Sequence, residues 1–136
     1  MNEQYLFRGK RKDNETWETG FLVITRSGCS DEKRFITDKM TGYCTPVIPE
    51  TVGQCTGSKD KNGKLIFDGD LLKFTNDDGE QSVYKVFYDD VYAGWRIQEM
   101  ESGGIDEMSD WEDNRKCFEV IGNIHDNEDL LPGLGG

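Results

Sequence analysis

Residues 51–70, T-V-G-Q-C-T-G-S-K-D-K-N-G-K-L-I-F-D-G-D, constrain the fold of this chain more than any other stretch. Two β-type segments, residues 51–56 and 64–67, flank a polar turn centred on Asn62-Gly63. Asn-Gly favours the left-handed backbone conformations that a tight hairpin needs. A second turn signal, Asp68-Gly69-Asp70, separates the hairpin from the apolar run that follows. The stretch therefore predicts a β-hairpin followed by a further strand.

Short segments with the alternation typical of strands recur along the rest of the chain. Gly20 inside one of them indicates a bulge or a close backbone approach. Residues 34–40 are ambiguous, because Phe35-Ile36-Thr37 favours a strand and the flanking charges favour a helical turn. We count about eight strands separated by turn signals, a spacing typical of a barrel or sandwich. Strands are expected at residues 5–11, 17–24, 51–56, 64–67, 71–75, 82–88, 94–98 and 116–125.

A length of 136 residues fits one domain whose hydrophobic core is large enough to be stable without disulfide bonds or metal ions. We predict a single compact domain over residues 1–131. Its parts are an N-terminal hairpin with an extended segment at 1–50 and a barrel-like part at 51–131. Residues 132–136 are predicted to be a disordered tail, because terminal residues are poorly ordered unless they are tied down.

The net charge of −11 is unevenly placed along the chain. Residues 1–73 carry 12 Lys/Arg and 11 Asp/Glu, and residues 74–136 carry 4 and 16. So acidic a chain is repelled by nucleic-acid phosphates, which argues against direct nucleic-acid binding. The one basic cluster has two interpretations. It could bind single-stranded nucleic acid beside aromatic rings, or it could be a solvated hairpin edge that discourages aggregation. The cluster and its neighbouring rings are Arg8, Lys10, Arg11, Lys12, Phe7 and Trp17.

The four cysteines, at positions 29, 44, 55 and 117, form no Cys-x-x-Cys pair. We interpret them as thiols in a reducing compartment, although their even number leaves a disulfide pair open. The N-terminus lacks the apolar region of a signal peptide, and no 18 apolar residues run together. We therefore expect a cytoplasmic protein without a membrane segment.

Three aspartates and one histidine are weak candidates for metal chemistry. Asp68 and Asp70 would point to one side of an extended strand, and paired carboxylates can bind a divalent metal. Asp60 falls on a position that mimics a calcium loop, but the twelfth position holds Gly69 instead of Glu. His125 has no identifiable nucleophile beside it. Turn capping by the aspartates and a strand-end role for His125 are the simpler interpretations, and we expect no cofactor.

Residues 57–65 superficially match a phosphate-binding loop. Five residues separate the glycines where the motif has four, and Leu65 replaces its Ser/Thr. The segment also lies between strands, so no helix N-terminus is available to receive a phosphate. A hairpin turn is the preferred interpretation.

Residues 99–113 form an acidic stretch with seven carboxylates in fifteen residues. Its composition is typical of a mobile, solvated loop, with a short helix near residues 108–111. Two alternatives remain open: a row of carboxylates that mimics nucleic acid, or a surface that pairs with the lysine-bearing half of another copy in a head-to-tail ring. The seven residues are Glu99, Glu101, Asp106, Glu107, Asp110, Glu112 and Asp113.

Three segments carry a family resemblance: F-R-G-K-R-K-D-N with W-x-x-G-F-L at the start, P-E-T-V-G-Q-C-T-G-S-K-D-K-N-G-K-L-I-F-D-G-D in the middle, and F-E-V-I-G-N-I-H-D-N-E-D-L-L at the end. Over nearly the whole chain, the sequence resembles the YopX-like family of phage and prophage proteins of Gram-positive bacteria. The resemblance implies a mainly β fold whose central part is a small SH3-like barrel, with an added N-terminal β-hairpin and little helix. It implies no catalytic or binding residues, because none is established for that family.

These observations favour a non-enzymatic binding or assembly module that forms homo-oligomers and engages a host or phage protein. A first alternative is an acidic nucleic-acid mimic or accessory of phage nucleic-acid metabolism. A second alternative is a metal-assisted hydrolase that uses Asp68, Asp70 and His125.

Overall fold

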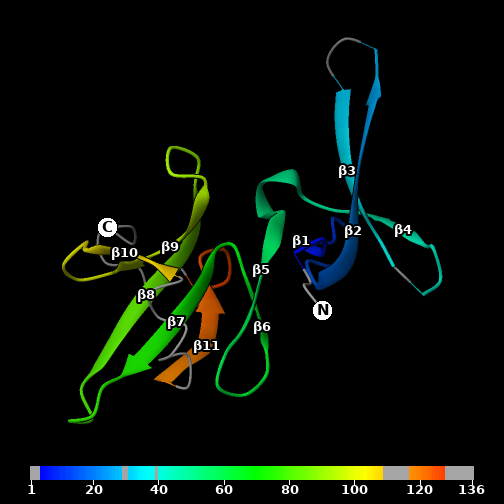
Figure 1. Ribbon diagram of the computed structural model, residues 1–136. Helices are drawn as coiled ribbons and strands as arrows, with labels where there is room; N and C mark the ends of the chain where they lie inside the picture. Colours follow the sequence, from blue (N-terminus) through cyan, green and yellow to red (C-terminus); the bar gives the residue numbers. More distant parts are fainter. Residues whose placement is uncertain (1–3, 29–30, 39, 109–116, 128–136) are drawn as a thin grey trace. The chain divides into compact units, whose positions relative to one another are not determined.

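The computed structural model describes residues 4–28, 31–38, 40–108 and 117–127. Eleven strands and one short 3-10 helix follow one another along these residues (Figure 1). The prediction of a mainly β fold with little helix is therefore confirmed. The elements are β1 Phe7–Lys10, β2 Trp17–Ser27, β3 Asp31–Thr37, β4 Cys44–Pro46, η1 Pro49–Thr51, β5 Gly53–Lys59, β6 Leu65–Phe67, β7 Asp70–Thr75, β8 Gln81–Asp89, β9 Gly94–Glu99, β10 Ile105–Glu107 and β11 Phe118–Asn123.

The described strands form two antiparallel sheets, with the orders β4-β3-β2-β1-β5-β6 and β10-β9-β8-β7-β11. No closed barrel is found among them, so the SH3-like barrel stays a prediction. The chain divides into two compact units, Met1–Gly57 (unit 1) and Ser58–Gly136 (unit 2). The division falls inside β5, seven residues after the one that we predicted between residues 50 and 51.

Unit 1 is built on the hairpin of β1 and β2, as the sequence predicts, with Phe7 opposite Gly20 and Lys10 opposite Trp17. A Cβ atom on Gly20 would collide with the carbonyl oxygen of Thr37 on β3. This collision confirms the close backbone approach expected at Gly20. The backbone of Thr37, at the end of β3, leaves no room for a side chain at this position.

The ambiguous segment at residues 34–40 is extended from its start to Thr37, as the end of β3. Strand geometry prevails there because β3 is paired on both sides. Ile36 lies opposite Leu22 of β2 and opposite Thr45 of β4. The Ile36 side chain is 2% exposed, so this pairing also buries a core residue of unit 1.

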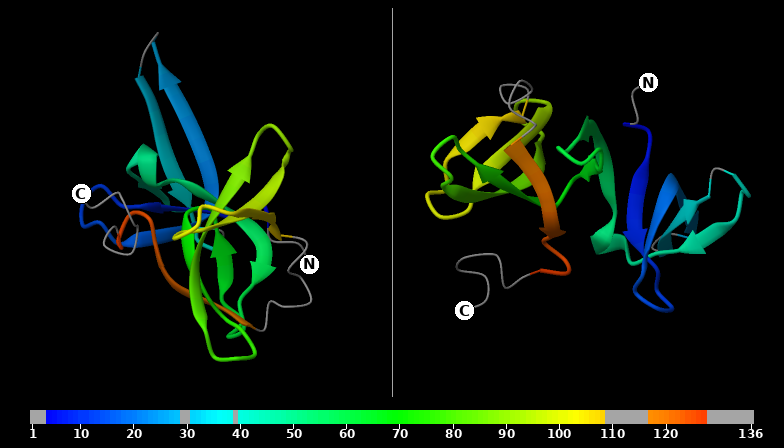
Figure 2. Two further views of the ribbon diagram at one scale, coloured as in Figure 1. Left: turned by 90° about the vertical axis from the view of Figure 1, so that its left-hand side faces the viewer. Right: turned by 90° about the horizontal axis from the view of Figure 1, so that it is seen from below.

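The hairpin of β2 and β3 extends well beyond its neighbouring strands. β1 pairs with β2 only from Trp17 to Gly20, and β4 pairs with β3 only from Phe35 to Thr37. Residues 22–27 and 31–34 therefore continue as a two-stranded ribbon, which we call the β2–β3 arm. The arm projects past β1 and β4 (Figures 1 and 2).

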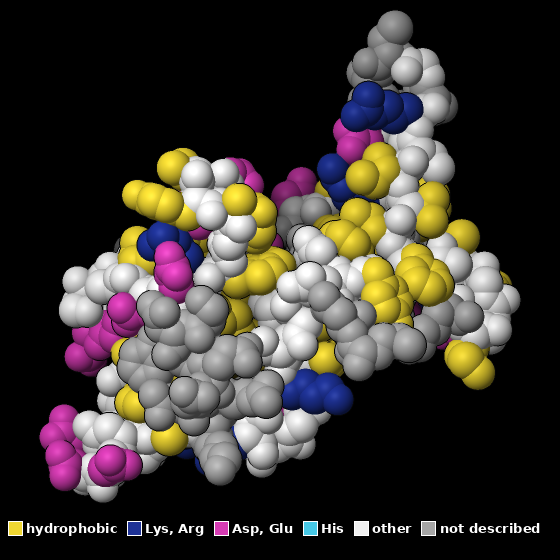
Figure 3. Space-filling model, viewed as in Figure 1, with side chains coloured by type: hydrophobic (Ala, Val, Ile, Leu, Met, Phe, Trp, Pro, Cys, Tyr) yellow, Lys and Arg dark blue, Asp and Glu magenta, His cyan; other side chains and the backbone are white. Residues whose placement is uncertain are grey.

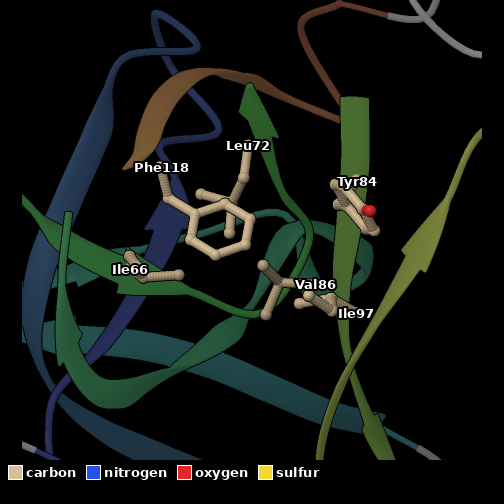
Figure 4. Packing of buried hydrophobic residues seen from close by; sticks show 6 residues of the cluster. All are labelled: Ile66, Leu72, Tyr84, Val86, Ile97 and Phe118. Carbon is tan, nitrogen blue, oxygen red and sulfur yellow. The ribbon is translucent and has the colours of Figure 1, made fainter. Parts of the chain in front are cut away.

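Unit 2 has its core where β7, β8, β9 and β11 pack against β6. Alternate residues of β8 point inward, and Tyr84 and Val86 are buried. The rings of Tyr84 and Phe118 meet edge to face with centroids 5.9 Å apart. The buried cluster consists of Ile66, Leu72, Tyr84, Val86, Ile97 and Phe118 (Figure 4).

The predicted β5–β6 hairpin is confirmed. The Asp60 amide donates to the Lys64 carbonyl at 2.8 Å, and the Gly63 amide donates to the Asp60 carbonyl at 3.0 Å. Gly63 has a φ of +80°, the left-handed conformation for which Asn-Gly is suited.

Candidate functional site

Asp60 stabilises the hairpin and ties it to the last strand of unit 2. Its Oδ1 accepts the amides of Asn62 and Lys64 at 2.9 Å, and its Oδ2 accepts the amide of Val120 at 3.0 Å. Burial raises the pKa of this carboxyl, but the three backbone donors outweigh burial and leave the pKa below its ordinary value. Both oxygens are thus directed at the backbone, as in a turn cap.

Asp70 and Asp68 flank Gly69, which has a φ of +88°. Asp70 is 1% exposed, and its Oδ2 accepts the amide of Phe67 at 2.8 Å. The capping role expected for this turn is therefore confirmed at Asp70. The Asp68 side chain is only partly exposed, and it lies at the start of the same turn.

His125 follows β11 in a turn organised by Asn123, whose Oδ1 accepts the amides of His125 and Asp126 at 2.9 Å. The amide of Ile124 donates to the carbonyl of Gly69 at 2.9 Å. The fold thus brings His125 next to the Asp68–Asp70 turn, although more than 50 residues separate them. Asp60 lies apart from this pair, at the β5–β6 turn.

Metal-binding geometry is not found at these residues. Across the described parts of the chain, no group of three or more His, Cys, Asp or Glu side chains could hold a metal ion. The part of the chain that resembled a phosphate-binding loop is the β5–β6 hairpin turn, in agreement with the preferred interpretation.

The acidic stretch is partly ordered. Residues 105–107 form β10, with Asp106 opposite Ile97 of β9, so the prediction of a solvated loop is wrong there. Pairing with β9 satisfies the backbone groups on one edge of β10, while the three side chains stay exposed. Residues 109–111 of the predicted short helix and the carboxylates Asp110, Glu112 and Asp113 lie outside the described residues.

The four described carboxylates of this stretch have different surroundings. Glu99 Oε2 accepts the amide of Ser102 at 2.6 Å, and this bond lowers the pKa of Glu99. Glu107 lies 3.7 Å from the guanidinium of Arg96, while Glu101 and Asp106 are exposed. Burial raises the pKa of Tyr84, and the charges of Asp106 and Glu99 add to that effect. Glu99 and Asp106 therefore lie near Tyr84, on the side of the sheet opposite Glu107.

The basic cluster does not lie at a sheet edge. β1 pairs with β2 on one side and with β5 on the other, so the expected solvated edge is wrong. Arg8 is 9% exposed, and its guanidinium lies 4.7 Å from the centre of the Trp17 ring. Arg11 forms ion pairs with Asp13 and Glu18 at 2.8 and 3.2 Å. The guanidinium groups of Arg8 and Arg11 therefore make contacts within unit 1.

The β2–β3 arm, together with Phe21 at its base, carries a candidate surface that was not predicted from the sequence. Four consecutive apolar residues of β2, Phe21 to Ile24, include none that is buried, and Phe21 and Ile24 are 41% and 45% exposed. No described strand pairs with the outer edge of β2 beyond Gly20. The sequence does contain a signal for this surface, a run of apolar residues on both faces of one strand. A strand in a two-layered fold buries only one face, so the apolar residues on the other face stay exposed.

A second exposed apolar group lies at the tip of the β8–β9 hairpin, where Figure 3 shows hydrophobic side chains on the surface. Val91 and Tyr92 are 85% and 68% exposed. The guanidinium of Arg96 lies 4.1 Å from the centre of the Tyr92 ring and 3.3 Å from Asp89. Arg96 thereby contacts two residues of the hairpin tip.

Comparison with known proteins then identifies the family. The family model described as YopX protein matches residues 6–132. The chain belongs to the YopX family. The resemblance noted from the sequence is confirmed, and it covers both units.

Two solved structures are similar to this YopX-family chain. Protein yopX from Bacillus subtilis has a TM-score of 0.58 and 21% identity, covering 96% of this chain and 99% of that one. Protein EF1440 from Enterococcus faecalis has a TM-score of 0.53 and 23% identity, covering 92% and 96%. At these identities the likeness establishes a common fold. No curated protein matches the chain, and no helix in its described part has the length and hydropathy to span a membrane.

Proposed function

We propose that this YopX-family protein is a non-enzymatic, self-associating binding or assembly module of a phage-type mobile element, acting in the cytoplasm. The proposal rests on the structure of the β2–β3 arm. It presents an apolar strand whose outer edge is paired with no other described strand. Residues 51–131 would be its SH3-like part.

Exposed apolar strand edges are normally blocked by charges, proline or bulges, because they pair readily with other chains. The sequence from Phe21 to Thr25 contains no charged residue and no proline. Its register with β3 runs without interruption from Phe21 to Ser27, so no bulge twists the edge away. An edge left open in this way favours association with another strand.

The distribution of charge supports association through unit 1. Met1–Gly57 carries eight Lys/Arg and eight Asp/Glu, whereas Ser58–Gly136 carries eight and 19. Two copies that meet through unit 1 therefore avoid the repulsion that two copies of unit 2 would experience. Figure 3 shows both charge signs interspersed with hydrophobic side chains along the arm.

Light scattering on the purified protein tests this function. We expect a mass above that of the 15.5 kDa chain at tens of micromolar protein. A strict monomer at that concentration would contradict the self-association.

The negative charge of unit 2 supports a second candidate function, that of a nucleic-acid mimic that binds basic host or phage proteins. The carboxylates of Glu101, Asp106 and Glu107 are exposed on or beside β10, within a unit of net charge −11. A lysate pull-down should then recover DNA- or RNA-binding proteins that moderate salt releases. Recovery of neutral partners alone would argue against mimicry.

The proximity of His125 to the Asp68–Asp70 turn is the observation that favours the hydrolase alternative. A thermal-shift screen with magnesium, manganese and calcium tests it. A metal that binds the folded state raises the melting temperature, so the absence of a shift with all three would remove this candidate.

A further inference from the structure

The open edge of β2 is bounded at both ends. The ring of Tyr5 lies against that of Phe21, with centroids 5.8 Å apart, and the arm turns at Gly28, which has a φ of +77°. Between them, residues 22–26 present a continuous edge. Leu22 and Ile24 lie on one face of the strand, and Val23 and Thr25 lie on the other.

We propose that β2 of a second copy occupies this edge, antiparallel, about a two-fold axis that passes midway between the two Ile24 residues. The inference rests on the self-association proposed above and names its partner and geometry. An antiparallel strand edge is complementary to itself, so no second type of surface is required.

Symmetry determines the register of such a pair. A two-fold axis perpendicular to the sheet leaves each face on the same side, so residues of one face meet residues of the same face. The axis must therefore pass midway between the two copies of one residue, and the centre of residues 22–26 is Ile24. Leu22 then lies opposite the partner's Arg26, Val23 opposite the partner's Thr25, and Ile24 opposite its own copy.

The chemistry of these pairs is compatible with close contact. Arg26 is an exposed side chain whose aliphatic stem can cover the Leu22 of the other copy. Its guanidinium lies 3.6 Å from Glu32 of its own β3, so its charge has a partner within the arm. Val23 and Thr25 are β-branched residues, which pack well across strands. No like charges face one another in this register.

The geometry also limits the size of the assembly. The same strand edge is used by both copies, so the contact is isologous and closes as a dimer. It differs from the head-to-tail ring considered from the sequence, which requires two different surfaces on each copy.

Disulfide trapping tests the register. In a Cys29→Ser/Cys44→Ser background, Ile24→Cys should form a dimer on oxidation, because Cα atoms directly opposite across antiparallel strands lie about 4.5–5.5 Å apart, within disulfide range. Phe21→Cys should form none, because its two copies would be separated by six residues, or about 20 Å along the strands. The readout is the dimer band on a non-reducing gel.

Loss of association provides the second measurement. Ile24→Lys places two like charges together on the axis, and we expect a monomer by light scattering with an unchanged circular dichroism spectrum. Val91→Lys, which changes an exposed apolar residue of unit 2, is the matched control and should keep the dimer.

The outcomes separate this inference from the proposed function. An assembly that survives Ile24→Lys, or that forms no disulfide through Ile24→Cys, overturns the β2 pairing and leaves self-association standing. A wild-type protein that is strictly monomeric overturns both.

Discussion

The carboxylate of Asp60 accepts the backbone amide of Val120 at 3.0 Å and so links two segments that are 60 residues apart in the sequence. The other carboxylate oxygen holds the turn between β5 and β6. A single side chain therefore joins the hairpin that the sequence predicted to β11, whose place in the fold is decided by tertiary contacts.

Asp60→Asn should lower the free energy of unfolding by about 2 kcal/mol. The amide oxygen can keep the bonds from Asn62 and Lys64, but the amide nitrogen would face the Val120 amide, donor against donor. Urea unfolding followed by circular dichroism measures the change. Asp90→Asn, at an exposed position after β8, is the control and should alter stability by less than about 0.5 kcal/mol. Equal effects of both substitutions would contradict the role of Asp60.

The contribution of Asp60 should depend on pH in a defined direction. Its pKa in the folded state lies below the ordinary value of 3.8, because the backbone donors outweigh burial. The stabilisation is therefore complete above the unfolded-state pKa and is lost as the pH falls through that value toward the folded-state pKa. We expect the stability difference between wild type and Asp60→Asn to shrink between about pH 5 and pH 3. A difference that grows on acidification would refute this assignment.

Gly20→Ala should destabilise unit 1 through steric contact alone. The new Cβ would collide with the Thr37 carbonyl oxygen, which belongs to a paired strand and cannot move independently. We expect a loss of about 2–3 kcal/mol in thermal or urea unfolding. Gly94→Ala is the matched control, since the nearest atom to its added Cβ is 3.9 Å away. Similar losses in the two variants would show that the effect comes from glycine replacement in general.

The described cysteines should differ in their reactivity with iodoacetamide. Cys44, Cys55 and Cys117 carry thiols, of which Cys44 is exposed and Cys55 is 0% exposed. Alkylation at Cys55 requires opening of the fold, so we expect Cys44 to react faster by on the order of 100-fold or more. Peptide mass spectrometry at short labelling times resolves the sites, and urea should abolish the difference. Comparable native rates would mean that Cys55 is not buried.

Much of the strand pattern could be predicted from local residues. Asn62-Gly63 specified a hairpin turn because few other pairs adopt its backbone conformation at low cost. Gly20 signalled a close backbone approach, which the Thr37 carbonyl oxygen makes. The candidate carboxylates Asp60 and Asp70 were correctly expected to be turn caps, although the donor from Val120 could not be foreseen.

The predictions from the sequence were wrong where a residue's surroundings depend on a distant strand. The charges around Arg8 suggested an edge, but β5 pairs with β1 and makes it an interior strand. The acidic composition near Asp106 suggested a loop, but β9 offers a backbone partner that composition does not reveal.

By itself, the sequence determined where the chain turns and which faces of its strands are apolar, because backbone conformation and side-chain alternation are properties of neighbouring residues. Only the tertiary structure decided which strands acquire two neighbours and which keep an open edge. Pairing depends on hydrogen bonds between distant segments, and each cross-strand pair contributes only about 0.2–1 kcal/mol. The exposure of Ile24 on the β2–β3 arm follows from that choice of neighbours.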